Sequence, residues 1–511
     1  MRHFVNLLVT ATAFMALETL AQDTIERKPL VIGTKIETGQ IVNGSQAGGE
    51  SGDPDDHYLS QIGVSLTQEV VVNRRLNVRV GVGGVFYSVF PAYPNNFGNT
   101  LGTKFGPGIT QAQAHYKFGE PDRSWGALRI GYFPYKYNPD AKNLGEYLFR
   151  AGAYPTFAIT GGWAITDNAS IRAQGIEFSL NQLDGDLKHS FLITNERDFR
   201  PAGDFTPSYL VEYTKGPIQI GGGVALYHWF PIKEERTNPR TINTAYYTFD
   251  NLPAYDAVHP ETGDTVSFAA NRRTLASYGD VQTIARELGH SWSANDVVDS
   301  MAAIYNMSTG YYETKAVKLM GRASFSVQKL FPMDFLNPND LKVYGEIALL
   351  GVENYPGMYE KRTERMPIMA GINLPTFRLL DMLAVEVEYF RNTNPDDMGA
   401  QQLWELPAYH WNTPNTGNLT GGSSGLAVER EYGVPGGYSL LFRDPNANRR
   451  DDWKWSVYAM KEIITGVSLR AQVANDHFRA QDANVTGYWT GPSMTRTPKD
   501  WYYVVAVTFG I

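Results

Sequence analysis

Charged residues of both signs are interleaved with apolar residues between positions 138 and 155. The charged members are Asp140, Lys142, Glu146 and Arg150. The apolar members are Leu144, Tyr147, Leu148 and Phe149. Charges that line a narrow opening of low dielectric set ion preference and orient polar solutes, while apolar neighbours can hold a segment against a wall. The segment therefore has the chemistry of a pore constriction, provided that the surrounding elements form a pore.

Further charges occupy alternate positions of segments that read as extended strands. The basic ones are Arg79, His115, Lys117, Arg129, Arg172, Lys318 and Arg322. Acidic residues take equivalent positions at Glu177, Glu212, Glu346, Glu386 and Glu388. Alternate residues of a strand share one face, so these charges would line one side of a sheet. Two interpretations stay open: the bases form a water-facing wall, or the acids pair with Lys318, Arg322 and Lys342 in a filled interior.

The C-terminal stretch shows the strand pattern most plainly. One face of it carries Trp501, Tyr503, Val505, Val507, Phe509 and Ile511, and the other carries Tyr502, Val504, Ala506, Thr508 and Gly510. The same alternation of apolar and polar residues recurs from Tyr58 onward, which predicts an all-β protein. A soluble β-sandwich also alternates, but roughly fifteen strands are too many for a single sandwich core. We therefore expect the apolar faces to point at lipid.

The composition limits the alternatives. No run of about 18 apolar residues follows the N-terminus, which excludes membrane-spanning helices. Residues 1–21 have a basic start, an apolar centre and a small-residue cleavage site, the pattern of a secretory signal peptide. The chain has no Cys, so we expect neither disulfides nor lipid attachment through a thiol. The net charge of −8 gives no reason to expect a nucleic-acid partner.

Short turns alternate with long loops along the chain. The sequence places short turns near 73–75, 119–125, 182–186, 215–217, 329–340, 377–380 and 463–466. It places long loops at 42–57, 91–108, 138–168, 197–206, 231–312, 353–363, 393–451 and 477–499. Eight hairpins predict sixteen strands, provided that residues 31–41 form the first one. Because short periplasmic turns and long outer loops are typical of bacterial barrels, we interpret residues 22–511 as a transmembrane antiparallel β-barrel.

This arrangement resembles the general porins of Gram-negative outer membranes, in which a long third outer loop folds into a sixteen-stranded barrel and narrows it. The resemblance covers the mature chain at the level of architecture and rests on no sequence motif. The Pro-Glu-Phe-Gly-Gly-like run of that loop is absent, and the chain ends in Ile511 where the family usually ends in Phe. The resemblance implies that loop 138–168 folds inward, that Arg79 and Arg129 face acidic loop residues, and that the barrel forms a homotrimer.

Two of the outer loops, 231–312 and 393–451, are much longer than the others. The first contains a predicted amphipathic helix on which Glu287 and His290 lie one turn apart. Without a third ligand, such a pair predicts a solvated helix face rather than a metal site. The second loop carries Trp404, Tyr409, His410 and Trp411, which could stack on sugars or pack the loop onto itself.

Three functions follow from these patterns. The first is a porin in the outer membrane, surrounded by lipid, that passes ions and small hydrophilic solutes by passive diffusion and needs no cofactor. The second is a surface protein in which the barrel anchors two long loops for adhesion or polysaccharide binding. The third is an outer-membrane lipase or protease, which would need His beside Ser or an acid at the rim. The nine His residues are scattered, so the sequence predicts no enzyme.

Overall fold

The computed structural model describes most of the chain in separate ranges. The described residues are 26–43, 58–90, 103–120, 123–149, 171–195, 204–227, 229–230, 245–258, 265–275, 278–293, 296–311, 315–353, 361–390, 453–475, 481–482, 489–490 and 501–510. The predicted signal peptide and the aromatic residues of loop 393–451 lie outside them. Among the described residues, no helix is long and apolar enough to cross a membrane.

Sixteen antiparallel strands form one closed ring. In ring order they are β2 (Val31–Asn43), β3 (Tyr58–Val71), β4 (Leu76–Phe90), β5 (Thr103–Glu120), β6 (Arg123–Tyr135), β7 (Ile171–Gln182), β8 (Leu187–Asn195), β9 (Phe205–Lys215), β10 (Ile218–Tyr227), β16 (Ala316–Ser326), β17 (Lys342–Leu349), β18 (Ile368–Asn373), β19 (Met382–Tyr389), β20 (Trp453–Ile464), β21 (Val467–Ala474) and β24 (Trp501–Gly510). The last strand pairs with β2 from Gly33 opposite Gly510 to Asn43 opposite Trp501, which leaves no free edge. A two-residue strand, β1 (Glu26–Arg27), extends the pairing of β3 beyond the ring.

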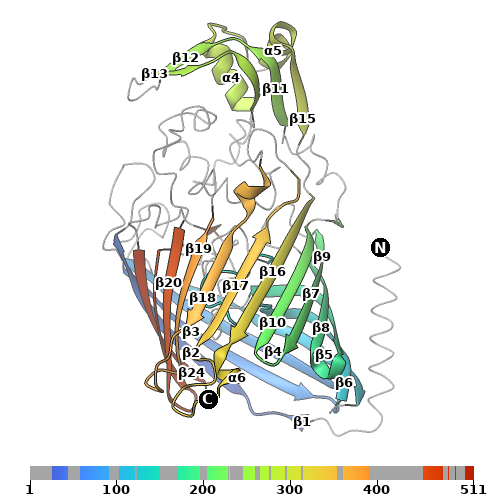
Figure 1. Ribbon diagram of the computed structural model, residues 1–511, viewed down its shortest axis with the longest axis vertical. Helices are drawn as coiled ribbons and strands as arrows, with labels where there is room; N and C mark the ends of the chain where they lie inside the picture. Colours follow the sequence, from blue (N-terminus) through green and yellow to red (C-terminus); the bar gives the residue numbers. More distant parts are fainter. Residues whose placement is uncertain are drawn as a thin grey trace.

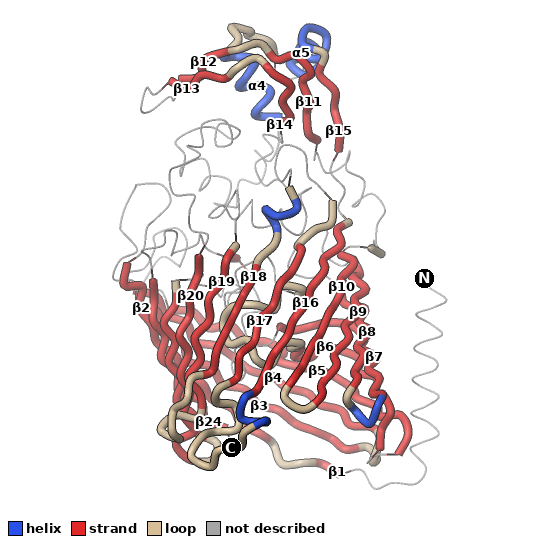
Figure 2. The backbone as a smooth tube through the Cα atoms, viewed as in Figure 1, coloured by secondary structure: helices blue, strands red, loops and turns tan. Residues whose placement is uncertain are grey.

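The connections alternate between short and long, as predicted. One rim carries the connections predicted to be short, including the 3-10 turn Leu183–Gly185. The longest connection at this rim, residues 327–341, contains the helix α6 (Val327–Leu330). The opposite rim carries the long loops, and Figures 1 and 2 show the strands running between these two ends. We call the two ends the short-turn rim and the long-loop rim. The strand predicted at 31–41 exists as β2, so the predicted count of sixteen is confirmed.

The wall of the ring has two chemically different faces. Along β16, the buried residues Lys318, Arg322 and Ser324 alternate with the exposed residues Leu319 and Phe325. Large apolar residues are exposed in the same way around the ring, including Ile36, Ile62, Val80, Ile220, Val343, Ile368, Val387 and Leu469. Since successive side chains of a strand point to opposite faces, the apolar face is the outer one and the polar face lines the interior.

One detail of the predicted register is wrong. The alternation of β7 changes phase near Gly175, which predicts a bulge there. In the structure, β7 pairs with β6 from Ile171 to Leu180 and with β8 from Gly175 to Gln182, with no shift at this glycine. An added Cβ at Gly175 would lie 2.1 Å from the Ile193 carbonyl oxygen, so close approach of β8 explains the glycine without a bulge.

The long connection between β10 and β16 contains a small folded unit. Its three-stranded sheet consists of β14 (Asn271–Leu275), β11 (Ala245–Leu252) and β15 (Met307–Tyr311), next to the hairpin of β12 (Tyr255–Val258) and β13 (Thr265–Phe268). The helices α4 (Tyr278–Glu287) and α5 (Val297–Tyr305) pack on it around a core of its own. Val281 and Ile284 are fully buried in this core, which confirms the predicted amphipathic helix. Figure 1 shows the unit beyond the long-loop rim.

Candidate pore constriction

The segment that follows β6 folds back against the inner face of the ring. We call residues 136–149 the inward segment. Its side chains Leu144, Tyr147 and Leu148 are fully buried in one cluster with Met320, Tyr344 and Met369 of the wall strands β16, β17 and β18. The apolar residues of the segment therefore pack on the wall, and the hydrophobic effect of their burial stabilises this contact.

Glu386 of β19 holds the middle of the inward segment. Its carboxylate accepts hydrogen bonds from three consecutive backbone N–H groups, those of Lys142 (2.5 Å), Asn143 (2.8 Å) and Leu144 (2.9 Å). The Tyr344 hydroxyl of β17 donates a fourth hydrogen bond of 2.9 Å. A buried carboxylate is stable only when such donors replace its hydration, so Glu386 and this turn stabilise each other.

Glu346 of β17 holds both ends of the inward segment. It accepts hydrogen bonds from the Tyr137 hydroxyl (2.5 Å), the Asn138 side-chain amide (2.7 Å), and the N–H groups of Glu146 (3.0 Å) and Tyr147 (2.9 Å). These donors lie on opposite sides of the turn that Glu386 holds. The two carboxylates therefore fix the segment at three places along its length.

A glycine on β18 makes the contact between Tyr344 and Glu386 geometrically feasible. Tyr344, Gly371 and Glu386 are register partners in a row across β17, β18 and β19. A Cβ at position 371 would lie 2.3 Å from the Tyr344 ring, so the ring lies directly over this glycine on its way to Glu386. Arg322 crosses Gly221 to reach Glu212 in the same manner, since a Cβ added at position 221 would lie 3.0 Å from the Arg322 Nε.

We expect Gly371→Ala to destabilise the barrel by about 1–3 kcal/mol, because the new methyl group displaces the Tyr344 ring. Denaturant unfolding of the two proteins measures the difference. Gly222→Ala is the matched control, since its nearest contact would be an ordinary 3.5 Å to the Met320 carbonyl oxygen. A double variant with Tyr344→Ala should lose less than the sum of the two single losses. Strict additivity would contradict the packing argument.

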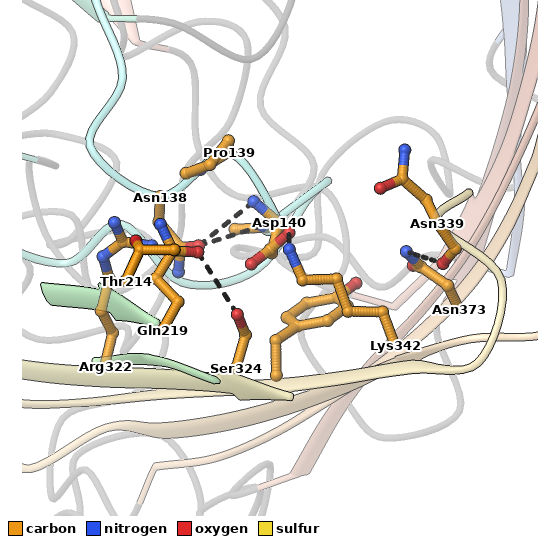
Figure 3. A network of polar contacts seen from close by, with 12 residues as sticks. Asn138, Pro139, Asp140, Thr214, Gln219, Arg322, Ser324, Asn339, Lys342 and Asn373 are labelled. Carbon is orange, nitrogen blue, oxygen red and sulfur yellow. Dashed lines mark hydrogen bonds and ion pairs between the residues drawn. The ribbon is translucent and has the colours of Figure 1, made fainter. Parts of the chain in front are cut away.

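The acidic residues of the inward segment face protein rather than water. Asp140 forms an ion pair of 2.5 Å with Lys342 of β17, and Figure 3 shows this lysine reaching from the wall to the segment. The Glu146 carboxylate accepts the Asn138 N–H at 2.9 Å. A pore constriction would need these two acids to project charge into water, but both carboxylates are buried. Paired with donors inside the fold, they shape the segment, and their effect on permeating ions stays a prediction.

Lys142 is a half-buried cation of the inward segment. Its amine donates to the Pro139 carbonyl oxygen at 2.8 Å. Burial, followed by repulsion from Lys136, lowers the pKa of this amine to about 8. The other predicted cation of the constriction, Arg150, lies outside the described residues.

This pKa makes the charge of the constriction depend on pH. The amine is protonated below pH 8 and neutral above it, so we expect any preference of the lumen for anions to weaken between pH 7 and pH 9. Reversal potentials in a salt gradient measure the change. Lys142→Gln should abolish the step, whereas Lys329→Gln on the exposed helix α6 should leave it in place. A step of equal size in both variants would contradict the assignment.

The predicted wall residues pair within the wall. Arg79 pairs with Glu69 at 2.6 Å, Arg129 pairs with Glu177, and Arg322 pairs with Glu212. The wall base that Asp140 of the inward segment meets is Lys342 of β17. Arg79 and Arg129 thus bond to acids of their neighbouring strands, whereas Asp140 pairs with a base on the part of the wall that the inward segment covers.

The remaining wall residues differ in their surroundings. His115 and Lys117 share the inward register of β5 and are neighbours of Arg129 and Ala127 on β6. Lys318 is fully buried, with its amine 4.4 Å from the centre of the Tyr227 ring. The side chain of Arg172 lies outside the described residues, and the uninterrupted register of β7 assigns position 172 to the face of Ile176 rather than that of Glu177.

Sequence reasoning did not identify the residues that hold the inward segment. The sequence pattern groups Glu346 and Glu386 with acids that pair with lysine and arginine, whereas in the structure they accept backbone and hydroxyl hydrogen bonds. Glu388 accepts the Tyr147 hydroxyl at 2.5 Å. No signal in the sequence separates these acids from the others, because Arg322 and Lys454 are the register partners of Glu346 and Glu388.

The described residues contain no group of three His, Asp or Glu side chains arranged to hold a metal ion. Glu287 and His290 do not form such a site. The His290 ring stacks on Trp292 at 4.0 Å and its Nε2 lies 2.8 Å from the Tyr305 hydroxyl.

Comparison with known proteins finds similarity in structure but none in sequence. No protein family and no curated protein matches the chain by sequence. Among solved structures, a porin of Rh. blastica is 8% identical, covers 96% of this chain and 100% of its own, and has a TM-score of 0.39. OprB of Pseudomonas putida is 8% identical, with coverage of 98% and 96% and a TM-score of 0.43. OmpF of Salmonella typhi, solved with daunomycin, is 7% identical, with coverage of 95% and 97% and a TM-score of 0.42.

The strand pairing itself defines the class of fold. A closed ring of sixteen antiparallel strands, with short turns at one rim and long loops at the other, is a porin-like architecture.

Proposed function

We propose that the protein is an outer-membrane channel for passive diffusion of ions and small hydrophilic solutes, narrowed by the inward segment. The observation that carries the proposal is the two-faced wall. Large apolar residues are exposed all around its outside, and ion pairs such as Arg79 with Glu69 line its inside. Such an outer face suits acyl chains and such an inner face suits water. Trimer formation and a Gram-negative source belong to this proposal as expectations from the resemblance, and the signal peptide belongs to it as an expectation from residues 1–21.

The geometry supports a partly filled lumen rather than a wide one. The inward segment covers the inner face of β16 to β19, where Glu346, Glu386 and Glu388 are buried. The strands β3 to β6 carry the more open part of the wall, where the Arg79 side chain is 42% exposed. Ions and small solutes would therefore pass along β3 to β6.

Conductance in planar lipid bilayers tests the proposal. Purified protein should insert and give discrete current steps whose size grows with salt concentration, as expected for a water-filled path. Protein that resists extraction from bilayers but gives no current would overturn the channel and leave only the barrel. Protein that stays soluble without detergent would overturn the membrane location itself.

A second candidate function is surface binding through the long loops. The specific observation in its favour is the folded unit of residues 245–311, because a passive channel needs no separate core in an outer loop. Replacing residues 245–311 by a short Gly/Ser linker separates the two functions. A channel function predicts unchanged conductance, whereas an adhesion function predicts lost binding of cells to polysaccharide-coated or host-derived surfaces.

A further inference from the structure

Large apolar side chains are exposed on three successive turns of the short-turn rim. These turns join β16 to β17, β18 to β19, and β20 to β21. The exposed residues are Leu330, Phe331, Phe335, Phe377, Leu379, Ile463 and Ile464. Phe377 is 62% exposed and Leu379 is 78% exposed. We call this set the turn platform. Exposed apolar patches of this kind mark a surface that contacts something other than water.

The backbone that carries the turn platform is firmly built. The Asn337 side-chain amide donates to the Thr376 hydroxyl at 3.0 Å and to the Leu380 carbonyl oxygen at 2.8 Å. The Lys461 amine donates to the Arg378 carbonyl oxygen at 3.2 Å, which joins the third turn to the second. The rings of Phe335 and Phe377 stack with centroids 6.2 Å apart. The exposure of the apolar residues is therefore a fixed feature of three interlocked turns.

The turn at Phe377 also adopts an unfavourable backbone conformation. Phe377 has φ of 53° and Arg378 has φ of 64°, within a turn closed by the Leu379 N–H and the Thr376 carbonyl oxygen at 3.0 Å. Glycine or asparagine is the usual choice for such positions, and a bulky residue there costs on the order of 1 kcal/mol or more. The backbone conformation therefore does not account for a phenylalanine at position 377, and we infer that its side chain is needed for a contact.

The neighbouring residues indicate what that contact is. The turns directly continue strands whose outer faces are apolar, with Phe325, Val343 and Ile372 exposed near their ends. Across the ring, near the same rim, the strands β5 to β8 carry a connected set of outward rings. These are Phe118, Trp125, Phe178 and Phe191. Aromatic side chains favour the interface between the acyl chains and headgroups, so this set fits a belt at that level.

We propose that the turn platform inserts into the interfacial layer of the lipid leaflet at the short-turn rim and completes this belt where β17 to β20 lack outward rings of their own at that level. The proposal rests on the proposed membrane location of the barrel. Lys329 and Arg378 are exposed beside the apolar residues, where their charged ends can reach headgroup phosphates. The turn platform extends over three successive turns along the rim. Lipid surrounds a membrane barrel along the same path, so this shape favours lipid over a protein partner.

Spin labels on single cysteines test the proposal, because the chain has no cysteine of its own. Phe335→Cys, Phe377→Cys and Ile464→Cys report on the three turns. Ile220→Cys, on the outward face of β10, is the lipid control. Asp184→Cys, on the exposed turn between β7 and β8, is the water control. Each labelled protein is reconstituted in phosphatidylcholine vesicles, and collisions with oxygen, which partitions into lipid, are compared with collisions with a water-soluble nickel chelate.

The turn platform predicts oxygen-to-nickel ratios several-fold above that of Asp184→Cys on at least two of the three turns. Ratios equal to the water control on all three turns, with Ile220→Cys in lipid, would overturn the lipid contact while leaving the membrane barrel intact. A water-like ratio at Ile220→Cys would instead overturn the membrane location and this inference with it. If Phe377→Cys fails to fold, Leu379→Cys reports on the same turn without changing the residue at the strained position.

Discussion

Replacing Glu386 by alanine is expected to raise the single-channel conductance, because the middle turn of the inward segment loses its acceptor. Three consecutive N–H groups, from Lys142 to Leu144, donate to this one carboxylate. Each of these donors that stays buried without a partner costs about 1–3 kcal/mol, so the segment gains more by leaving the wall and hydrating its backbone. Movement of the segment opens the lumen in front of β16 to β19. We expect larger and noisier current steps than those of the unmodified protein.

Two further variants make this experiment decisive. Glu212→Ala also removes a wall carboxylate, but its partners Arg322 and Gln219 lie on the wall, so the inward segment should stay in place. The double variant Glu346→Ala with Glu386→Ala removes both acceptors and should exceed the effect of Glu386→Ala alone. Equal conductance for Glu386→Ala, the double variant and the unmodified protein would show that the segment does not limit the current.

Replacing Arg79 by glutamate is expected to shift ion selectivity strongly toward cations. Arg79 is the more exposed member of its ion pair with Glu69, so the substitution places two adjacent carboxylates on the open part of the wall. A unit charge about 10 Å from a permeating ion, at an effective dielectric constant of about 30, contributes on the order of 1 kcal/mol. The substitution changes the wall by two units, so a several-fold change in the anion-to-cation permeability ratio is expected, weaker at high salt.

The position of Arg79 makes it a better test than Arg129. Arg129 contacts the more buried Glu177 and lies 4.4 Å from the Phe133 ring centre, so Arg129→Glu combines a change of field with a loss of stability. Arg272→Glu is the charge-matched control, because Arg272 lies in the folded unit beyond the long-loop rim and its side chain is 75% exposed. An unchanged reversal potential in Arg79→Glu would remove this residue from the ion path, and an equal shift in Arg272→Glu would point to the field of the whole protein.

Strand alternation made most of the ring predictable. Residues 76–83 show uninterrupted two-residue periodicity, because one face of the strand must be apolar and the other polar. The alternation of apolar and polar residues is weaker in β8 and β18. These two strands are held in the ring by backbone pairing with both neighbouring strands, which their own sequence patterns do not predict. The folded unit of residues 245–311 was missed apart from helix α4, since its short strands carry too few residues for a periodic signal.

The sequence by itself determined the number of strands, the alternation of short and long connections, and the apolar residues by which the inward segment packs. These properties depend on local periodicity, which each segment carries within itself. Only the tertiary structure decided which charges meet. Glu386 is more than two hundred positions away from the N–H groups it accepts, and Asp140 is equally remote from Lys342. Partners at that separation are set by the order of strands around the ring and by their register, and a list of acids and bases along one chain contains neither.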